Sequence, residues 1–362
     1  RVLDVARKHP ERLKVELNAL ATRIILDAEN RAVGVEYLAG ERLYRAHASP
    51  SGGPGSSRVV RASREVVVAG GAFNSPQLLM LSGIGARVEL ERHGIAVRVD
   101  LPGVGKNLQD RYEVSVVNRM NFDQWGALAG ARFAPGDPLY EEWAALRTGM
   151  YTTNGAAMTM IRKSAPHRPL PDIFLMALLG QFKGYFPGYA SLLPQGLNYL
   201  SWTILKAHTN NRAGAVTLRS ADPRDTPAIN FRYFEEGSDA AGDDLRAVVE
   251  AIKFVRLMTQ PLKDKGLIAE EELPGDDDRS DEKLAAFVRR QAWGHHASCT
   301  CAIGPRDRNG VLSGDFRVHG TSGLRVVDAS VFPRIPGFFI ASAIYMIAEK
   351  AADAILSDAR RA

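Results

Sequence analysis

The sequence predicts a mixed α/β and α+β fold in which a second domain interrupts the first. Three observations lead to this fold class. An apolar run closed by two glycines precedes a helical segment near residue 70, the middle has short strand-like runs without regular helices between them, and the last segment again combines a strand with a helix. We therefore expect one domain at 1–110, continued at 291–362, and a largely antiparallel domain at 111–290.

Length and composition agree with a globular protein of about two domains. The chain has 362 residues, 45% of them hydrophobic and 24% charged, which excludes disordered and collagen-like proteins. The chain contains no run of 18 apolar residues, so the sequence predicts no membrane-spanning helix. The net charge of +5 is not clustered, so nucleic acid is not an expected partner. Two cysteines one residue apart provide no disulfide framework, which predicts a reducing, cytoplasmic location.

The first hundred residues alternate between strand and helix patterns. Residues 13–17 and 24–26 have strand character, 32–38 is the expected partner, and 48–57 is a Gly/Pro/Ser loop at a hairpin tip. The run at 65–69 suits a parallel strand buried on both faces. The elements expected after it are a helix at 75–81 with Pro76 in its first turn, a helix at 87–93 ending at Gly94, and a short strand at 97–99.

The middle and the tail complete the expected pattern. Strands are predicted at 174–179, 200–205, 215–219 and 229–232, with turn residues between them. Apolar residues spaced at about 3.6 predict a helix at 245–258. Further elements are expected as a helix at 282–292, a strand at 324–327 and a last helix at 342–356.

Two glycine turns could approach a ligand. Gly70 and Gly71 end the buried strand and lead into a helix, whose first N–H groups are free. The alternative is an ordinary strand-to-helix turn. The second turn, LPGVGKNLQD at 101–110, contains GxG without the full GxGxxG, and its alternative is a turn closed by the side chains of Asn107 and Asp110.

The segment GHHASCTCAIG at 294–304 combines two histidines with a CxC pair. Zinc is one interpretation, but CxC has poor geometry for one ion and no second cysteine pair exists, so we predict no metal. The second interpretation is a catalytic imidazole, because histidine titrates near neutrality. The third is a buried structural histidine pair. The absence of GxSxG, P-loop and HExxH motifs removes the main support for a hydrolase, a nucleotide-binding loop or a metalloprotease.

Taken together, these segments resemble the glucose–methanol–choline (GMC) family of flavin oxidoreductases. The similar stretches are GAFNSPQLLMLSGIG, DLPGVGKNLQD, NRAGAVTLRSADPRDTPAINFRYF, HHASCTC, and LRVVDASVFPRI with MIAEKAADAI, in that order along the chain. The resemblance implies a partial FAD-binding domain of the glutathione-reductase type with an inserted antiparallel substrate domain. It also implies FAD as cofactor, a small-molecule alcohol as substrate, and hydride transfer from the CH–OH carbon to flavin N5.

The resemblance also assigns residues. It places the catalytic base, which accepts the hydroxyl proton, at His296, and the family's second catalytic position at Phe339. It implies FAD contacts for eight residues, listed in chain order: Ala21, Gly70, Gly71, Asn107, His295, Asp328, Ala329 and Ile340.

The sequence departs from the family pattern at three places. The opening strand with GxGxxG is not in the chain, so we expect weak FAD binding by this chain alone, and possible help from a chain that supplies the segment. Arg111 stands where the family has histidine in LQDH. Phe339 stands where relatives carry Asn or His, and phenylalanine cannot hydrogen-bond the substrate oxygen. Two hypotheses follow: an FAD-dependent alcohol oxidase or dehydrogenase, or a catalytically weak or inactive fragment that acts only within an assembly.

Overall fold

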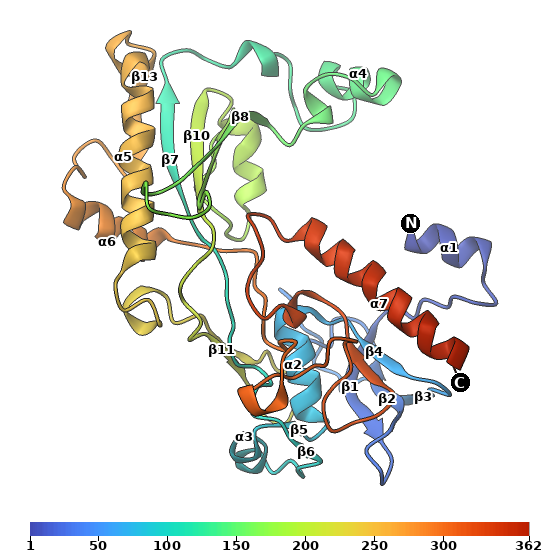
Figure 1. Ribbon diagram of the computed structural model, residues 1–362. Helices are drawn as coiled ribbons and strands as arrows, with labels where there is room; N and C mark the ends of the chain where they lie inside the picture. Colours follow the sequence, from blue (N-terminus) through green and yellow to red (C-terminus); the bar gives the residue numbers. More distant parts are fainter. Residues whose placement is uncertain (362) are drawn as a thin grey trace.

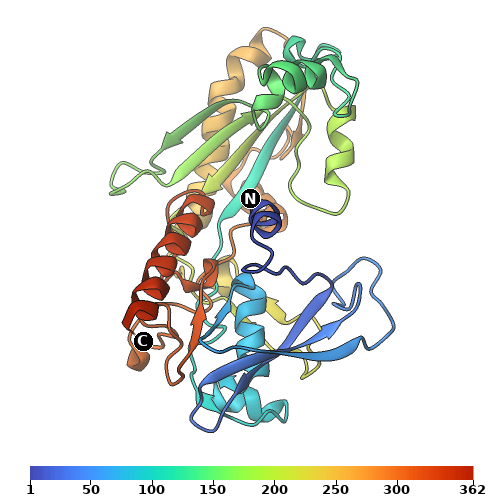
Figure 2. The same ribbon diagram turned by 90° about the vertical axis from the view of Figure 1, so that its right-hand side faces the viewer.

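The computed structural model describes residues 1–361, which form two lobes, each with its own hydrophobic core (Figures 1 and 2). In the lower lobe of Figure 1, β1 (Ala19–Leu26), β2 (Ala32–Ala39) and β3 (Ser56–Arg61) form an antiparallel sheet. A second, parallel pair joins β4 (Val66–Val68) to β14 (Leu324–Val326), which lie far apart in the sequence. The lobe therefore combines the beginning and the end of the chain.

Helices and short strands complete the lower lobe. They are α1 (Val2–Lys8), α2 (Gly71–Leu81), β5 (Ile84–Gly85), α3 (Arg87–Arg92), β6 (Val99–Asp100) and α7 (Ala341–Arg361). α2 follows β4 directly, and its Leu79 and Met80 are buried in the lower core. Figure 1 shows α7, in red, running from the region between the lobes down along the lower lobe.

The upper lobe is built on a five-stranded antiparallel sheet in the order β13–β7–β10–β9–β8. Its strands are β7 (Tyr112–Met120), β8 (Ala156–Arg162), β9 (Ile173–Leu178), β10 (Tyr199–Lys206) and β13 (Ile268–Leu273). α5 (Asp243–Asp264) packs on one face, with α6 (Asp281–Gln291) beside it, while α4 (Pro138–Leu146) belongs to an arm that projects over the other face (Figure 1). The amphipathic pattern of α5 explains this packing, because Val248, Ile252 and Val255 are buried in the upper core.

Alternation along the strands decides which side chains face α5. Ile173, Leu175 and Ala177 of β9 are buried in the core under α5, so the half-buried Phe174 and Met176 point to the opposite face. On β7, Tyr112 and Val114 belong to the same core, so Glu113 between them also points away from α5. This second face of the sheet carries the candidate site.

Most predicted elements are present, and several details are corrected. Residues 13–17 form no strand, because no neighbouring strand pairs with them. α2 begins at Gly71 rather than 75, which places Pro76 inside the helix and not in its first turn. The strand at 65–69 is shortened to β4 and is buried on one face only, since Val67 is 43% exposed. β6 begins two residues later than the expected strand at 97–99.

Two predicted strands of the middle segment lie outside the five-stranded sheet. β11 (Ala215–Thr217) and β12 (Ala228–Asn230) form a separate antiparallel pair. The Gly105 carbonyl meets this pair, because it accepts the backbone N–H of Val216 at 2.7 Å, while the Gly105 N–H donates to Thr300 O at 2.8 Å. The 101–110 glycine turn is thus packed against β11, and a Cβ on Gly105 would lie 2.1 Å from Val216 O. The turn needs glycine for close packing and for its φ of +78°.

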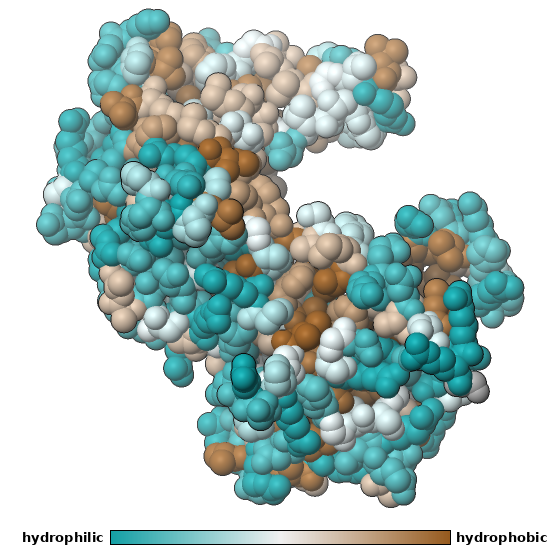
Figure 3. Space-filling model, in the orientation of Figure 1, coloured by the Kyte–Doolittle hydropathy of each residue, from teal (hydrophilic) through white to brown (hydrophobic). Residues whose placement is uncertain are grey.

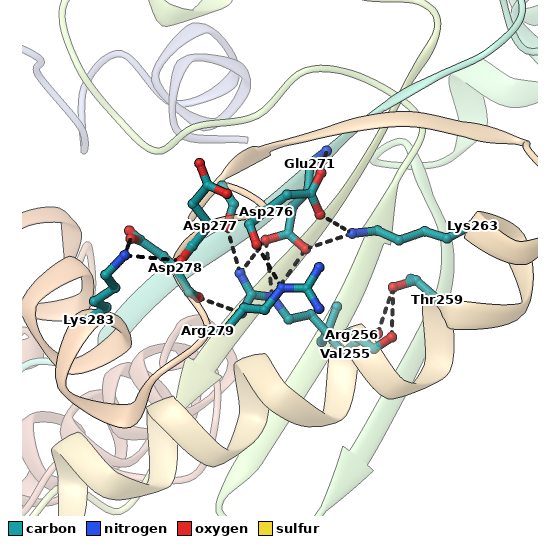
Figure 4. Close-up of polar contacts among 11 residues, drawn as sticks. Val255, Arg256, Thr259, Lys263, Glu271, Asp276, Asp277, Asp278, Arg279 and Lys283 are labelled. Carbon is teal, nitrogen blue, oxygen red and sulfur yellow. Dashed lines mark hydrogen bonds and ion pairs between the residues drawn. The ribbon is translucent and has the colours of Figure 1, made fainter.

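A buried ion cluster ties α5 to β13 and the following loop (Figure 4). The side chain of Glu271 is fully buried, and Arg256 Nε lies 3.1 and 3.2 Å from its two oxygens. Lys263 Nζ lies 3.5 Å from the same carboxylate, and Arg256 also donates to the carbonyl oxygens of Asp278 and Gly275. The cluster therefore satisfies a carboxylate that would be costly to bury alone.

Arg256→Met should lower the free energy of unfolding by roughly 2–3 kcal/mol. The loss falls below that of a fully unpaired buried charge because Lys263 remains near Glu271. Urea unfolding measures the change. Arg279→Met is the matched control: Arg279 is exposed and should change stability by less than about 0.5 kcal/mol. Equal losses for the two variants would show that the buried Arg256–Glu271 pair contributes no more to the free energy of unfolding than an exposed arginine does.

Within residues 1–361, no helix has the length and apolar character needed to cross a membrane. The space-filling view shows the molecule hollowed between the two lobes, with apolar side chains exposed in the hollow (Figure 3).

Candidate functional site

A cavity of about 720 Å³ lies on the face of the upper sheet that α5 leaves open. β9 and β10 form its floor, and the arm around α4 supplies aromatic side chains on another side. The aromatic residues that line it are Phe133, Tyr140, Trp143, Tyr151, Phe174, Phe182, Tyr185, Tyr189 and Phe339. Of the described lining residues, Glu113 is the only acidic one, and the remainder is largely apolar. The cavity therefore suits an uncharged apolar or aromatic molecule.

The histidine loop is held against the start of β7. Glu113 and Trp293 exchange two backbone hydrogen bonds of 2.9 Å, and Gln109 and Ser298 exchange another pair. The Asp110 carboxylate accepts the backbone N–H of His296 at 2.8 Å. These contacts fix the position of His296 from both sides along the chain. Burial raises the pKa of Asp110 to about 6, which is the consequence of placing this carboxyl inside the protein.

His296 is a buried imidazole beside a buried carboxyl group. The residue is 6% exposed, and its Nδ1 lies 3.2 Å from Oε1 of Glu113. Burial lowers the pKa of His296 to about 4, because the charged form loses its hydration. Burial likewise raises the pKa of Glu113 to about 7. The imidazole is therefore neutral at pH 7 and able to accept a proton.

His295 lies closer to the cavity than its neighbour. It lines the cavity, its side chain is 37% exposed, and its Nδ1 lies 3.5 Å from Oε1 of Glu113. Its ring centroid is 4.0 Å from that of His296 and 4.8 Å from that of Tyr185. The two adjacent histidines thus both approach one carboxylate.

Phe339 meets His296 at the edge of the cavity. Its ring is 5.7 Å from the His296 ring and 4.9 Å from the ring of Phe174, in edge-to-face contact with Phe174. It is 44% exposed and lines the cavity. Phe339, where the resemblance predicts the family's second catalytic position, therefore lies close to His296, and its side chain is apolar.

Arg111 holds the loop that carries Phe339. Its side chain is fully buried and donates to the backbone carbonyl oxygens of Pro336, Gly337 and Phe338, the last at 2.9 Å from Nε. Burial lowers the pKa of Arg111 to about 10, where it is still charged at pH 7. Arg111, one departure from the family pattern, thus holds the three residues that precede Phe339, another departure, through three hydrogen bonds.

The predicted cofactor residues around the parallel strands come together. β4 and β14 end side by side, with Val68 paired to Val326. The Asp328 carboxylate accepts the Gly71 N–H at 3.0 Å and the Ser75 hydroxyl at 2.5 Å. Ligands of parallel α/β sheets bind at this end of the strands.

Open space in front of α2 fits a bound group. Gly70 is exposed, and a Cβ on Gly71 would meet no atom within 4 Å. The first two residues of α7, Ala341 and Ser342, are exposed as well, directly after the loop that carries Phe339. Small residues and exposed helix starts are therefore present where the predicted FAD would need close approach of the backbone.

The other predicted cofactor residues have different surroundings. Asn107 adopts φ +63° and donates its amide to the carbonyl oxygens of Pro333 (3.2 Å) and Cys299 (3.4 Å), so it joins two loops. Ala329 is buried, and its carbonyl accepts the N–H of Cys299 at 3.1 Å. Ile340 is buried in the lower core. Ala21 is exposed on β1, in the separate three-stranded sheet.

The CxC pair is not directed at the histidines. Cys299 and Cys301 are free, and both belong to the lower hydrophobic core. Burial raises the pKa of Cys299 to about 12, so the thiol stays protonated at pH 7. The zinc interpretation based on these cysteines therefore has no structural support.

Sequence reasoning missed Glu113, which contacts both histidines. The signal was present in YEVSVVNRM, where polar side chains alternate with apolar ones at the start of β7. Its later residues obscure the pattern, because β7 is buried along nearly its whole length.

Comparisons with known proteins agree with this architecture. Models of the N-terminal and C-terminal parts of the GMC oxidoreductase family match residues 3–113 and 210–348. Oxygen-dependent choline dehydrogenase from Burkholderia cenocepacia is 35% identical over 98% of this chain and 57% of its own length. Human mitochondrial choline dehydrogenase is 34% identical over 95% of this chain and 54% of its own length.

Solved structures show the same fold. A variant of formate oxidase from Aspergillus oryzae has a TM-score of 0.78 at 27% identity, over 95% of this chain and 60% of that chain. An FAD-dependent oxidoreductase from Chaetomium thermophilum has a TM-score of 0.75 at 22% identity, over 98% and 64%, and shows the fold alone. The fold is thus confirmed as mixed α/β, and the family supports FAD as the predicted cofactor.

The chain spans a little over half the length of these curated relatives. The two family models together cover the strand-and-glycine segment near residue 70, the histidine loop and the β14 segment. The resemblance predicted from the sequence is confirmed at this level: the chain belongs to the GMC oxidoreductase family.

Proposed function

We propose that the complete protein oxidises the CH–OH group of a small-molecule alcohol, with His296 as general base. The observation that carries the proposal is a buried, neutral imidazole at the edge of a cavity lined by aromatic side chains. FAD, when bound, supplies the acceptor for the hydride that leaves the carbinol carbon. The alternative of an inactive family member receives no support from the relatives.

The residues around His296 assign its nitrogens. Nδ1 faces the Glu113 carboxyl group, so Nε2 is the nitrogen left to accept the hydroxyl proton of the substrate. Removing that proton raises electron density on the carbinol carbon and makes hydride departure easier. The contact of Asp110 with the His296 N–H holds the backbone in place during this transfer.

The cofactor arrangement belongs to the same proposal. Residues 1–110 and 291–362 would form part of the FAD-binding domain, and 111–290 the substrate domain. Gly70, Gly71, Asp328 and Ala329 at the ends of β4 and β14 would hold FAD. Three of them are small, and the space in front of Gly71 is open. Asn107, His295, Ile340 and Ala21 stay predictions from the family resemblance.

The cavity favours an apolar alcohol with an activated C–H bond, such as an aryl or allylic alcohol. Phe339 and Phe174 offer ring faces and edges to such a substrate. Phe339 offers no hydrogen bond to the alkoxide, so an activated C–H bond would compensate for the missing donor.

Phe339→Asn in the complete enzyme should raise turnover of simple aliphatic alcohols by up to about 10²–10³-fold, since one donor at a developing oxyanion is worth roughly 2.7–4 kcal/mol. The same change should weaken binding of aromatic alcohols. Steady-state kinetics with paired aliphatic and aryl alcohols measures both effects. Phe133→Asn is the control, because Phe133 lines the same cavity from the α4 arm. Loss of flavin reduction for every alcohol would show that the native site requires Phe339, which would contradict the idea that this position lacks a useful donor.

The direct test of the proposal is anaerobic mixing of the purified flavoprotein with an aryl alcohol. Bleaching of the oxidised flavin absorbance with saturable dependence on alcohol concentration is expected. A flavin that stays oxidised with aryl, allylic and aliphatic alcohols would reject the proposed function.

A further inference from the structure

Three side chains with metal-binding atoms converge beside the cavity. Glu113 comes from β7, and His295 and His296 come from the loop that pairs with it. One ligand atom from each residue lies within 4.8 Å of the other two. Nδ1 of His295 and Nδ1 of His296 lie 3.5 Å and 3.2 Å from the same oxygen, Oε1 of Glu113. This set differs from the His and CxC combination considered from the sequence, because a carboxylate replaces the buried thiols.

The spacing agrees with four-coordinate zinc. Bonds of about 2.0–2.1 Å in a tetrahedron place neighbouring ligand atoms about 3.3 Å apart. The two measured distances from Oε1 lie on either side of that value. One ligand atom of each residue lies within 4.8 Å of the other two, so an ion at this point would also draw the two imidazoles toward that spacing.

Two buried atoms in the cluster have no hydrogen-bond partner within the described structure. They are Oε1 of Glu113 and Nδ1 of His296, on residues that are 5% and 6% exposed. They approach each other, but without the geometry of a hydrogen bond. Buried polar atoms without partners are uncommon in native proteins and call for an explanation. A cation between them would satisfy both.

The cavity provides access and an open coordination position. Glu113 and His295 line it, so an ion held by the three side chains would face the cavity with its remaining position. Two imidazoles and one carboxylate, with one position open, match the ligand sets of zinc. Calcium and magnesium prefer oxygen ligands alone, so they fit this set less well.

We propose that Glu113, His295 and His296 form an inhibitory binding site for a divalent ion of the zinc class, open to the cavity. This proposal departs from the sequence-based prediction of no metal. Ligation through Nδ1 of His296 leaves the ring proton on Nε2, which then has no lone pair for a substrate proton. No covalent bond is made or broken apart from this change of tautomer. The inhibitory effect, unlike the binding, rests on the proposed role of His296 as base.

Cobalt(II) tests the binding without flavin or substrate. Titration of the metal-free 362-residue chain should produce the strong visible bands of four-coordinate Co²⁺, and Zn²⁺ should remove them at one equivalent. Glu113→Gln and His295→Ala should each weaken binding by at least about 100-fold, since even loss of a group that supports a ligand costs about 10–100-fold. His47→Ala, at an exposed histidine outside the cluster, should leave the titration unchanged. Absence of the bands would overturn the site. So would Co²⁺ affinities in the Glu113 and His295 variants equal to that of the unchanged chain, provided that both variants keep a native circular dichroism spectrum.

A second measurement addresses inhibition in the complete flavoprotein. Saturating Zn²⁺ should slow alcohol-dependent flavin reduction, and a chelator should restore it. Unchanged reduction at saturating Zn²⁺ would overturn the inhibitory role. A flavoprotein that is not reduced by alcohol even without metal would instead reject the proposed function, and the Co²⁺ titration would still decide the site.

Discussion

Replacing the proposed base should have the largest effect on activity. His296→Ala in the complete flavoprotein should lower the rate of flavin reduction by about 10²–10⁴-fold, the usual contribution of a positioned general base. The reason is that His296 is the buried imidazole at this edge of the cavity, whereas the side chain of its neighbour His295 is 37% exposed and lines the cavity. Stopped-flow absorbance of the flavin measures the rate directly.

The neighbouring histidine provides the matched control. His295→Ala should reduce the rate much less, because the family resemblance gives His295 a backbone contact with the cofactor. Flavin absorbance before mixing shows whether each variant still contains FAD. Equal losses in the two variants, or an unchanged rate in His296→Ala, would contradict the assignment of the base.

Loss of the buried arginine should have the largest effect on stability. Arg111→Met should lower the free energy of unfolding by roughly 3–5 kcal/mol. The change leaves the carbonyl oxygens of Pro336, Gly337 and Phe338 without their donor and removes the positive charge beside Asp110 and Glu113. Chemical unfolding followed by circular dichroism measures the loss.

Arg111→Lys separates charge from geometry. Lysine keeps a cation near Asp110 but lacks the planar guanidinium that reaches three successive carbonyl groups. We expect intermediate stability together with faster hydrogen exchange in the loop at 336–340. A lysine variant with native stability and native exchange would show that the charge alone holds the loop.

The sequence predicted the elements whose signal is local. The apolar period of α5 and the partner runs of β1 and β2 were found because each pattern is complete within one segment. The strand expected at 13–17 was wrong for the complementary reason: its alternation is correct, but pairing depends on a neighbour that the local sequence does not encode. The predicted burial of Val67 was wrong for the same reason, because burial of a strand face depends on what packs against the sheet.

The sequence identified the loops that carry the candidate site, but it did not predict the contacts between them. The histidine segment and the Asp328 turn were identified from their residue types, and the structure brings each to a strand end or to the cavity. Glu113 was missed because its importance comes from pairing between β7 and a segment about 180 residues later in the chain. The contact between Arg111 and the loop before Phe339 was missed for the same reason. Both residues were noted as departures from the family pattern, but the hydrogen bonds join segments that are far apart in the sequence.

The central claim is that a neutral His296 beside the aromatic cavity removes the alcohol proton during flavin reduction. A primary test is the solvent and substrate deuterium isotope effect on anaerobic flavin reduction, measured with an aryl alcohol and its α-deuterated form in wild type and in His296→Ala. Wild type should show a substrate isotope effect on a fast reduction. The variant should be reduced much more slowly, and its rate should rise with assay pH, because hydroxide then removes the alcohol proton in place of the imidazole. A variant as fast as wild type at pH 7, with the same isotope effects, would contradict the claim.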